Sequence, residues 1–473
     1  MNLKITAAVA VALACSTSAF ASNLTTTINN GVAAGTIKLV ASGSSASRDA
    51  FLALMKDFAC NTTTSGDTFD VYEITPTTNK DFRAYSCTIA AGFGTASGKT
   101  ATVYYRSEGG SAFGAVPIAT NTQVMRLQID NTCTTTSTKT FTGTTGNIVV
   151  HDCVIPAASG DYSLATDTAT GTAANYLTKD TVTLAAGDEE PKMYGAPNFP
   201  SSTVFPAATD SARQSLLSGL TGVQVGFAQI FSVIVNTAAG SPFVGASPAA
   251  PPQIGRTTLS GIFSGAYNDW QQVPTISGAP VSPVSVPIKV CRREQGSGTQ
   301  VAAAQYFLGV KQCVGAPGTF VTDTESPTLP FASDTDGVIE RGTTGDLTAC
   351  VQALPGGIGF IAVPANGVAP ANTAFVAING QTPSQQKAAS GQYDFVYELT
   401  YKSVATGDAG ALASGLISRA QHSASAPPVA SVISLPNAFN DPFSQTDFTS
   451  QPIISFGSRG GNSCSNIKAS PAF

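Results

Sequence analysis

The stretch VCRREQGSGTQVAAAQYF, residues Val290 to Phe307, decides how the rest of this sequence is interpreted. A β-rich segment, Val284 to Cys291, leads into two arginines and a Gly-Ser-Gly-Thr turn, and Gln300 to Leu308 suits a helix. A strand that enters a helix through small residues presents free backbone N–H groups, hydroxyl donors and the positive end of the helix dipole at one point. This pattern predicts an anion site. Capping of the helix by Ser297 and Thr299 accounts for the same residues equally well.

Two earlier segments repeat the order of strand, Gly/Ser turn and helix or further turn. Residues 36–45 read TIKLVASGSS and precede an amphipathic helical pattern, and residues 102–111 read TVYYRSEGGS. Three such turns in one chain favour anion binding over capping alone. Arg48, in the first turn of the first helix, is a further candidate ligand, although solvation or a pair with Asp49 explains it as well.

Length and charge set the class of protein. With 473 residues the chain exceeds the usual size of one domain, so two lobes or domains are expected. Charged residues make up 11% of the sequence, below the roughly 25% of typical soluble domains. A net charge of -5 gives no excess of positive charge that would attract nucleic acid or acidic membranes. Any bound anion must therefore be held by local geometry.

The N-terminal residues 1–21, MNLKITAAVAVALACSTSAFA, have a Lys near the start, an apolar run and a small-x-small ending. These are the features of a secretory signal. Removal of Cys15 with this segment leaves eight cysteines, an even number that suits an oxidising compartment. We expect a periplasmic or secreted protein without a membrane anchor, because no later stretch reaches the 18 or more apolar residues of a membrane span.

The eight cysteines predict four disulfides. Proximity in the sequence favours Cys60 with Cys87 and Cys133 with Cys153. The remaining four, Cys291, Cys313, Cys350 and Cys464, leave three pairings open. A bond from Cys464 to any of the other three would tie the C-terminal tail to the second lobe and restrict hinge motion.

Catalytic motifs are not found in the sequence. It has two histidines, His151 and His422, and contains no nucleophile elbow, zinc-spaced His/Cys set or P-loop lysine motif. His151 is interpreted as a surface residue, with metal binding as the weaker alternative. We therefore predict neither an enzyme nor a cofactor.

Helical and strand patterns alternate through the middle of the chain. Asp210 to Leu220 suits a helix, Val223 to Asn236 a central strand, Leu347 to Leu354 a short helix and Gly356 to Val363 a buried strand. A Pro-rich stretch at Ser247 to Gln253 separates the two groups. This order predicts a two-lobed α/β fold.

In this order the segments resemble the substrate-binding component of phosphate ABC importers, within the type II periplasmic binding proteins. The resemblance rests on Ala41 to Ser45, Tyr104 to Ser111, Gly187 to Pro191, Leu259 to Gly265 with Trp270, Arg293 to Thr299, Gly357 to Phe360, and Ile378 to Tyr401. It leaves out the regions near 60–100 and 121–185 and the far C-terminal tail, which are extra to the family pattern.

The resemblance implies a periplasmic-binding-protein-like α/β fold with β-rich insertions and a ligand cleft between two lobes. After the signal peptide at 1–21, lobe 1 takes 22–236 with insertions near 60–100 and 121–185. Lobe 2 takes 237–364, and residues 365–473 return to lobe 1 and form the tail. The implied oxyanion ligands are Ser45, Ala46, Gly110, Ser111, Asp188, Arg293, Gln295, Ser297, Gly298 and Thr299.

The function implied is capture of inorganic phosphate, or a similar oxyanion, by hinge closure, with an ABC importer membrane component as a partner. Asp188 can accept a hydrogen bond only from a protonated oxyanion, which favours hydrogen phosphate over sulfate. Gln295 departs from the family motif, which has an acidic residue there, so selectivity rests mainly on Asp188. An extracellular structural or adhesion protein that reuses the fold without transport is the alternative, favoured by the Thr/Gly-rich insertions, the disulfides and the low charge.

Overall fold

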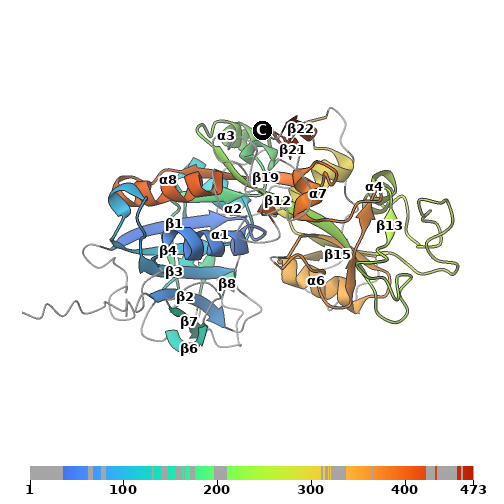
Figure 1. Ribbon diagram of the computed structural model, residues 1–473, viewed down its shortest axis with the longest axis horizontal. Helices are drawn as coiled ribbons and strands as arrows, with labels where there is room; N and C mark the ends of the chain where they lie inside the picture. Colours follow the sequence, from blue (N-terminus) through green and yellow to red (C-terminus); the bar gives the residue numbers. More distant parts are fainter. Residues whose placement is uncertain are drawn as a thin grey trace, which may run out of the picture.

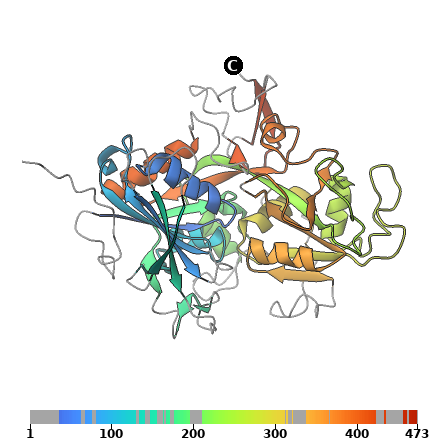
Figure 2. The same cartoon turned by 60° about the horizontal axis from the view of Figure 1, so that its bottom comes forward.

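The computed structural model describes residues 36–61, 68–75, 81–129, 133–139, 147–154, 162–163, 166–170, 176–195, 210–310, 313–314, 318, 320, 337–364, 366–421, 432–433, 455–459 and 462–471. The predicted signal segment 1–21 and His422 lie outside these residues. Figures 1 and 2 show two lobes side by side, with β12 at the place where they join. The α/β fold class and the two-lobed arrangement expected from the sequence are confirmed.

The central element is β12 (Gln224–Asn236), a strand of 13 residues that belongs to both lobes. Its first half, up to Ile230, pairs with β19 (Val396–Ser403) in the first lobe. Its second half, from Phe231, pairs with β16 (Gly357–Ala362) in the second lobe. The strand is buried from Gly226 to its end, as its nearly continuous apolar sequence predicts.

The first lobe is built on a mixed sheet. From β12 the order is β19, β11 (Leu184–Gly187), β1 (Ile37–Gly43), β4 (Thr100–Arg106), β3 (Phe82–Thr88), β2 (Thr68–Thr75), β7 (Asn147–Val154) and β6 (Cys133–Lys139). Its helices are α1 (Arg48–Leu54) with η2 (Met55–Ala59), α2 (Ala112–Thr120) and α8 (Gly407–Gln421). Strands from both regions expected as insertions, near 60–100 and 121–185, extend this sheet.

The second lobe continues the same sheet in the order β12, β16, β14 (Lys289–Arg293) and β15 (Val338–Arg341). It carries α4 (Arg256–Phe263), α5 (Gly298–Ala303) with η6 (Ala304–Leu308), and α6 (Thr344–Ala353). Trp270 is fully buried and its indole N–H donates to the Gly356 carbonyl over 3.0 Å. Strand β14 begins later than the expected Val284, because Pro283 and Pro287 lack the N–H group that a sheet requires.

Smaller elements complete the described residues. They are η3 (Gly94–Ala96), β5 (Gln123–Leu127), β8 (Tyr162–Ser163), β9 (Thr168–Ala169), β10 (Leu177–Thr181), η5 (Pro191–Met193), α3 (Asp210–Ser218), β13 (Gln253–Ile254), β17 (Thr373–Phe375), β18 (Ala377–Ile378), α7 (Gln385–Ala389), β20 (Val432–Ile433), β21 (Ser455–Ser458) and β22 (Lys468–Pro471). None of the helices in the described part of the chain is long and apolar enough to cross a membrane.

The chain returns to the first lobe later than residue 365, the position expected from the sequence. Strand β17 pairs with the second-lobe half of β12, and β18 pairs with β13. Pairing with first-lobe strands resumes only at β19. Strands β17 and β18 therefore pack with the second lobe.

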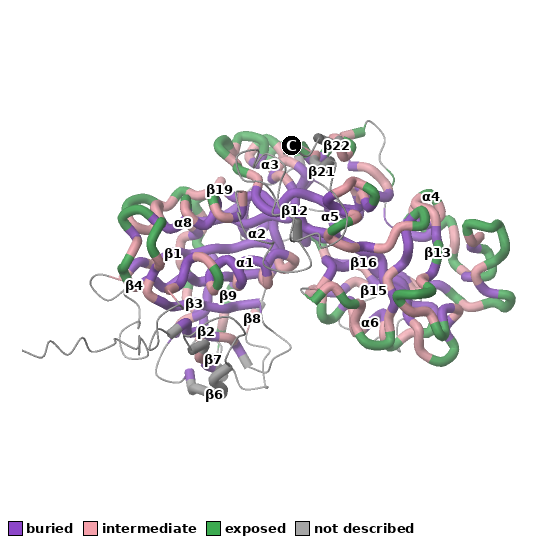
Figure 3. Tube along the Cα trace, in the orientation of Figure 1, coloured by how far each residue is buried: buried purple, intermediate pink, exposed green. Residues whose placement is uncertain are grey.

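The lobes share a hydrophobic core where they meet. Phe113 and Val116 of α2 belong to the same cluster of buried residues as Val301 and Phe307 of the second-lobe helix. In Figure 3 the buried stretches follow the central strands of both lobes. A large apolar junction opposes free movement of two lobes.

The interpretation of His151 as a surface residue is wrong. Parallel pairing of β2 with β7 places His151 opposite Tyr72, and the two rings stack with centroids 4.4 Å apart. The His151 side chain is buried, and its Nε2 lies 2.9 Å from Asp70 Oδ1. His151 is thus part of the structural interior of the first-lobe sheet.

The eight cysteines form four disulfides. Cys60–Cys87 and Cys133–Cys153 are the pairs favoured by proximity in the sequence, with Cα atoms 5.6 and 4.1 Å apart. Among the pairings left open, the structure has Cys291–Cys350 and Cys313–Cys464. Cys291–Cys350 links β14 covalently to α6. Cys313–Cys464 links the C-terminal segment covalently to the second lobe.

Candidate functional site

Three turns of the first lobe converge because β1, β4 and β11 are parallel and end at the same edge of the sheet. Ser44 directly follows β1, Ser111 directly precedes α2 as its N-cap, and Asp188 directly follows β11. The Ser44 hydroxyl donates to Asp188 Oδ1, and the Asp188 amide donates to Ser111 Oγ over 3.2 Å. All three side chains are at most 1% exposed. They form the first-lobe half of a buried polar cluster.

The turn at the start of α5 supplies the second-lobe half. Thr299 Oγ1 lies 3.5 Å from Asp188 Oδ2, to which it donates, and the Ala112 amide donates to the Gly296 carbonyl over 3.2 Å. Ser297 Oγ accepts from the Gln300 amide over 3.4 Å, so Ser297 does cap the helix. The two lobes are in direct contact at this point.

Arg293, at the end of β14, joins the two halves. Its Nη1 donates to Ser45 Oγ of the first lobe over 3.3 Å and to Thr344 Oγ1 of the second over 2.9 Å. Its Nη2 donates to the Gly342 carbonyl. The residue is 2% exposed, and its Nε has no hydrogen-bond partner among the described residues. A buried guanidinium with an unused donor is suited to an added acceptor.

Acidic groups surround this cation. Burial raises the pKa of Asp188 to about 6, against the opposing effects of the Ser44 hydrogen bond, the Arg293 charge and the Thr299 hydrogen bond. Burial also raises the pKa of Glu294 to about 7. The pKa of Glu108 lies well above its ordinary value because of burial and the nearby charges of Asp81 and Glu294. An anion entering here meets one guanidinium and several carboxyl groups, an environment that favours an anion carrying its own proton.

Glycines permit the close approach of the lobes. Gly110 has a φ of +69°, and a Cβ atom added there would lie 2.7 Å from the Gly296 carbonyl oxygen and 2.9 Å from Ser297 Cα. A Cβ atom on Gly298 would overlap Ser111 Oγ and the Asp188 carboxyl. Side chains at either position would force the lobes apart.

Replacement of Gly110 by alanine is expected to weaken the contact between the lobes and to lower ligand affinity about tenfold, a cost of about 1.4 kcal/mol. Gly98→Ala is the matched control, because Gly98 also has a positive φ, +76°, but its Cβ would meet nothing within 4 Å. Both variants carry the same backbone strain, so comparison by calorimetric titration isolates the steric effect. Equal affinities of the two variants would contradict the expectation.

Most of the residues expected as ligands lie in this cluster, and two do not. Gln295 is exposed at the turn, and its side chain makes no hydrogen bond to the described residues. Arg48 lies beside carboxylates instead, with its Nε 3.6 Å from Asp49 Oδ1 and its Nη1 3.9 Å from Asp81 Oδ1. Ala46 is half-buried in the turn that follows Ser45.

Three residues that contact the cluster were not singled out from the sequence. Ser44, not Ser45, donates to Asp188. Gly342 and Thr344 hold Arg293 because β14 and β15 are parallel, with Arg293 opposite Arg341, so their turns meet at one edge. The sequence VIERGTTGDL, residues 338–347, has the same order of strand, small-residue turn and helix as the other segments. This pattern could have identified Gly342 and Thr344 as site residues.

No family model matches the sequence, and no curated protein matches it. Among solved structures, the chain is similar to one assigned as a phosphate ABC transporter substrate-binding protein, with bound phosphate, from Clostridium perfringens. The identity is 11%, the TM-score is 0.39, and 80% of this chain and 92% of that chain are covered. It is also similar to an ABC-type phosphate transport receptor from Vibrio cholerae, at 16% identity and a TM-score of 0.29, covering 50% and 74%.

The described residues contain no group of three or more His, Cys, Asp or Glu side chains arranged to hold a metal ion. The cluster itself offers hydroxyl and guanidinium donors and the buried carboxyl group of Asp188 as an acceptor.

Proposed function

We propose that this chain binds a protonated oxyanion, hydrogen phosphate first among them, between its two lobes. The observation that carries the proposal is the convergence of hydroxyl donors, one guanidinium and one buried carboxyl at a single point, with contributions from both lobes. Ser44, Ser111 and Asp188 come from the first lobe, and Arg293 and Thr299 from the second.

Each group has a role that its chemistry permits. The planar guanidinium of Arg293 can bind two anion oxygens, and its free Nε supplies one of these donors. The hydroxyls of Ser44, Ser111 and Thr299 can donate to the remaining oxygens. Asp188, when ionised, can accept a hydrogen bond from the hydroxyl group of hydrogen phosphate. Sulfate has no proton near neutral pH, so it would leave a buried acceptor unpaired, at a cost of about 1–3 kcal/mol or more.

Ligand entry requires the lobes to separate, because the candidate ligands now bond to one another. The bonds from Ser44 and Thr299 to Asp188, and from Arg293 to Ser45, would be exchanged for bonds to the anion. An anion that contacts both lobes binds the closed form better than the open form, which is the differential affinity that closure needs. No catalytic step is involved.

We place this function outside the cytoplasm, as a periplasmic or secreted protein, because four disulfides suit an oxidising compartment. An importer's membrane component is the partner that follows from the resemblance in sequence. Strands β2, β3, β6 and β7 extend the first-lobe sheet beyond that resemblance, so a complex with such a component would be tested separately from binding.

Titration of the mature protein with inorganic phosphate at pH 7 is expected to release or absorb heat and to raise the melting temperature. Sulfate is expected to bind about 100-fold more weakly, which corresponds to about 2.7 kcal/mol. The absence of both phosphate heat and thermal stabilisation at millimolar phosphate, with the fold intact, would refute the proposal. That result would favour the structural or adhesive alternative.

A further inference from the structure

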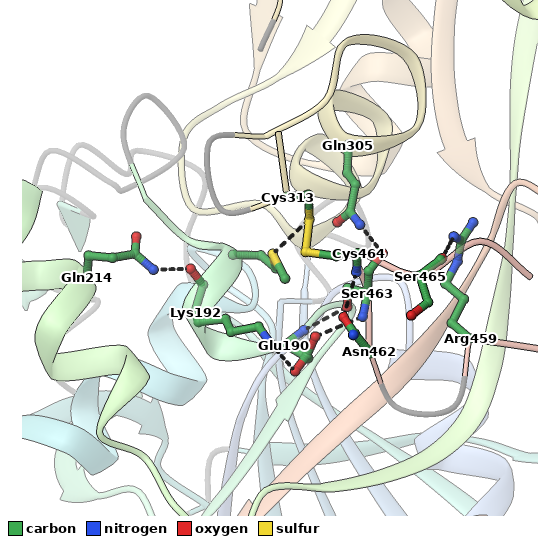
Figure 4. The surroundings of a disulfide bond; sticks show 11 residues. Glu190, Lys192, Gln214, Gln305, Cys313, Arg459, Asn462, Ser463, Cys464 and Ser465 are labelled. Carbon is green, nitrogen blue, oxygen red and sulfur yellow. Dashed lines mark hydrogen bonds and ion pairs between the residues drawn. A yellow bond between two sulfur atoms is a disulfide. The ribbon is translucent and has the colours of Figure 1, made fainter. Parts of the chain in front are cut away.

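A short C-terminal segment lies across the junction of the two lobes. Residues Asn462–Ser465, called the strap below, are drawn in Figure 4 with their neighbours. Cys464 of the strap forms a disulfide with Cys313, with Cα atoms 5.1 Å apart and a sequence separation of 151 residues. The strap is thus covalently fixed to the second lobe, beyond the end of the helix formed by α5 and η6.

Ser463 forms hydrogen bonds to one residue of each lobe, and both of these residues lie close in sequence to the candidate site. Its amide donates to Glu190 Oε2 over 2.8 Å, and Glu190 stands two residues after Asp188. Its carbonyl accepts from the Gln305 side chain in η6, which continues the helix that begins at Gly298. Figure 4 shows Glu190, Ser463 and Gln305 in this order. One residue, Ser463, therefore links the acidic loop of the first lobe to the helix that begins at Gly298 in the second.

Arg459 anchors the start of this segment on the crossing strand β19. Its amide donates to Glu398 Oε1 over 2.8 Å, and its Nε donates to the Val396 carbonyl over 2.8 Å. Its Nη2 donates to the Asp394 carbonyl over 3.0 Å. Its Nη1 donates to the carbonyl of Ser465, the last residue of the strap. The strap is held both at the point where the chain crosses between lobes and at the disulfide.

The disulfide also touches the first lobe. Cys313 Sγ lies 3.9 Å from Met193 Sδ of η5. Since neither sulfur carries a proton, this is a van der Waals contact. Met193 and the adjacent Tyr194 belong to the core cluster that the lobes share. Separation of the lobes along this side would have to break apolar contacts and the bonds of Ser463 together.

Access distinguishes this disulfide from the other three. Cys464 is exposed and Cys313 is half-buried. The other six bonded cysteines are at most 4% exposed. Thiol–disulfide exchange requires that a thiolate reach one of the two sulfurs. A reductant will therefore meet the Cys313–Cys464 bond first.

We propose that the strap is a disulfide-locked clasp that limits how far the two lobes separate, and that reduction of Cys313–Cys464 releases it. In that step a dithiol reductant gives two electrons and two protons. Its own sulfurs close into a disulfide, and Cys313 and Cys464 become thiols. The proposal concerns movement of the ligand-free chain, so it goes beyond the binding function and does not depend on phosphate.

The first test is the order of reduction. The intact mature protein is treated with a low concentration of dithiothreitol, alkylated, and mapped by mass spectrometry. Cys313 and Cys464 are expected to be alkylated before any other cysteine. Earlier or simultaneous labelling of another pair would overturn the redox part of the proposal.

The second test is the distance between the lobes. Fluorophores are placed through bioorthogonal amino acids at Ala91 and Ile276, exposed residues of the first and second lobe. Energy transfer in the ligand-free protein is then compared for the wild type, Cys313→Ser/Cys464→Ser and Gln305→Ala. Both variants are expected to shift the distance distribution to longer values, the first more than the second. Gln305→Ala keeps the disulfide, so it tests the strap even where loss of the bond impairs folding.

Cys291→Ala/Cys350→Ala is the matched control, because it removes a disulfide that lies within the second lobe. It is expected to lower the melting temperature without shifting the distance distribution. Identical distributions for the wild type and both strap variants would overturn the clasp. Because no ligand is present in this measurement, its failure is distinguishable from failure of the binding function.

Discussion

Replacement of Arg293 by alanine is expected to weaken phosphate binding by about 100-fold or more. Each hydrogen bond to a charged group contributes about 1.5–3 kcal/mol, and the guanidinium can make two with one anion. The variant would also leave Asp188 without the cation that opposes the upward shift of its pKa. Calorimetric titration with phosphate at pH 7 measures the loss. Arg293→Lys is expected to recover only part of it, because an ammonium group lacks the planar fork.

Arg292→Ala is the matched control for this variant. Arg292 is the preceding residue of β14, and its Nη2 pairs with Glu340 instead of with the site. Successive residues of a strand point to opposite faces, so this change removes a positive charge from the same strand without touching the cluster. We expect affinity for phosphate to stay at the wild-type value. A similar loss in both variants would mean that net charge, and not the position of Arg293, holds the anion.

Asp188→Asn is expected to stabilise the ligand-free protein above pH 6. Burial raises the pKa of Asp188 from 3.8 to about 6 in the folded state. The contribution of Asp188 to the free energy of unfolding is therefore fully present below about pH 4, where the carboxyl group is protonated in both states. This contribution is lost as the pH rises through 6 and the buried group ionises. The neutral amide avoids that loss. A shift of about two pKa units corresponds to about 3 kcal/mol at pH 8. Denaturant unfolding of both proteins between pH 3.5 and 8 measures the difference, which should vanish at the acid end.

Asp269→Asn serves as the control, because it is expected to change folding stability in the opposite direction. Hydrogen bonds, first that from Ser285, lower the pKa of Asp269. Its contribution to stability is present above its unfolded pKa and lost as the pH falls, so its amide variant should be less stable near neutral pH. If both amide variants changed stability in the same direction, burial of Asp188 would not explain its effect.

The same Asp188→Asn variant should lose discrimination between anions. An amide NH₂ group donates, and sulfate offers only acceptors, so the penalty against sulfate disappears. We expect phosphate and sulfate affinities within about tenfold of each other, where the wild type separates them by about 100-fold, a change of about 1.4 kcal/mol in selectivity. Retained rejection of sulfate would show that another group selects the ligand.

Elements with strong local patterns were predictable from the sequence. The apolar run of β12 and the glycine-rich β16 are strands within one or two residues of the expected bounds, and α3 is a helix where its pattern places it. The turn after β14 also has the expected form, with Ser297 as a helix cap. In each case neighbouring residues alone determine the local conformation.

Features that depend on register between distant strands were not predictable. Burial of His151 depends on the parallel pairing of β7 with β2, about which the local sequence says nothing. The contacts of Arg293 with Gly342 and Thr344 depend on the pairing of β14 with β15. Likewise, whether Ser44 or Ser45 donates to Asp188 depends on the direction of each side chain within one turn. Spacing along the chain identifies such turns but not which atom of each faces inward.

The division of β12 between two lobes has a consequence for biosynthesis. In the first lobe β19 lies between β12 and β11, yet it is made only after the whole second lobe. Until residues 396–403 emerge, β11 and the first half of β12 lack the strand that separates them, and their edges are open to wrong partners. The second lobe is built from one continuous stretch of chain and can fold before the first is complete. We therefore expect the order of folding to run from the second lobe to the first, with the Cys313–Cys464 bond among the last to close.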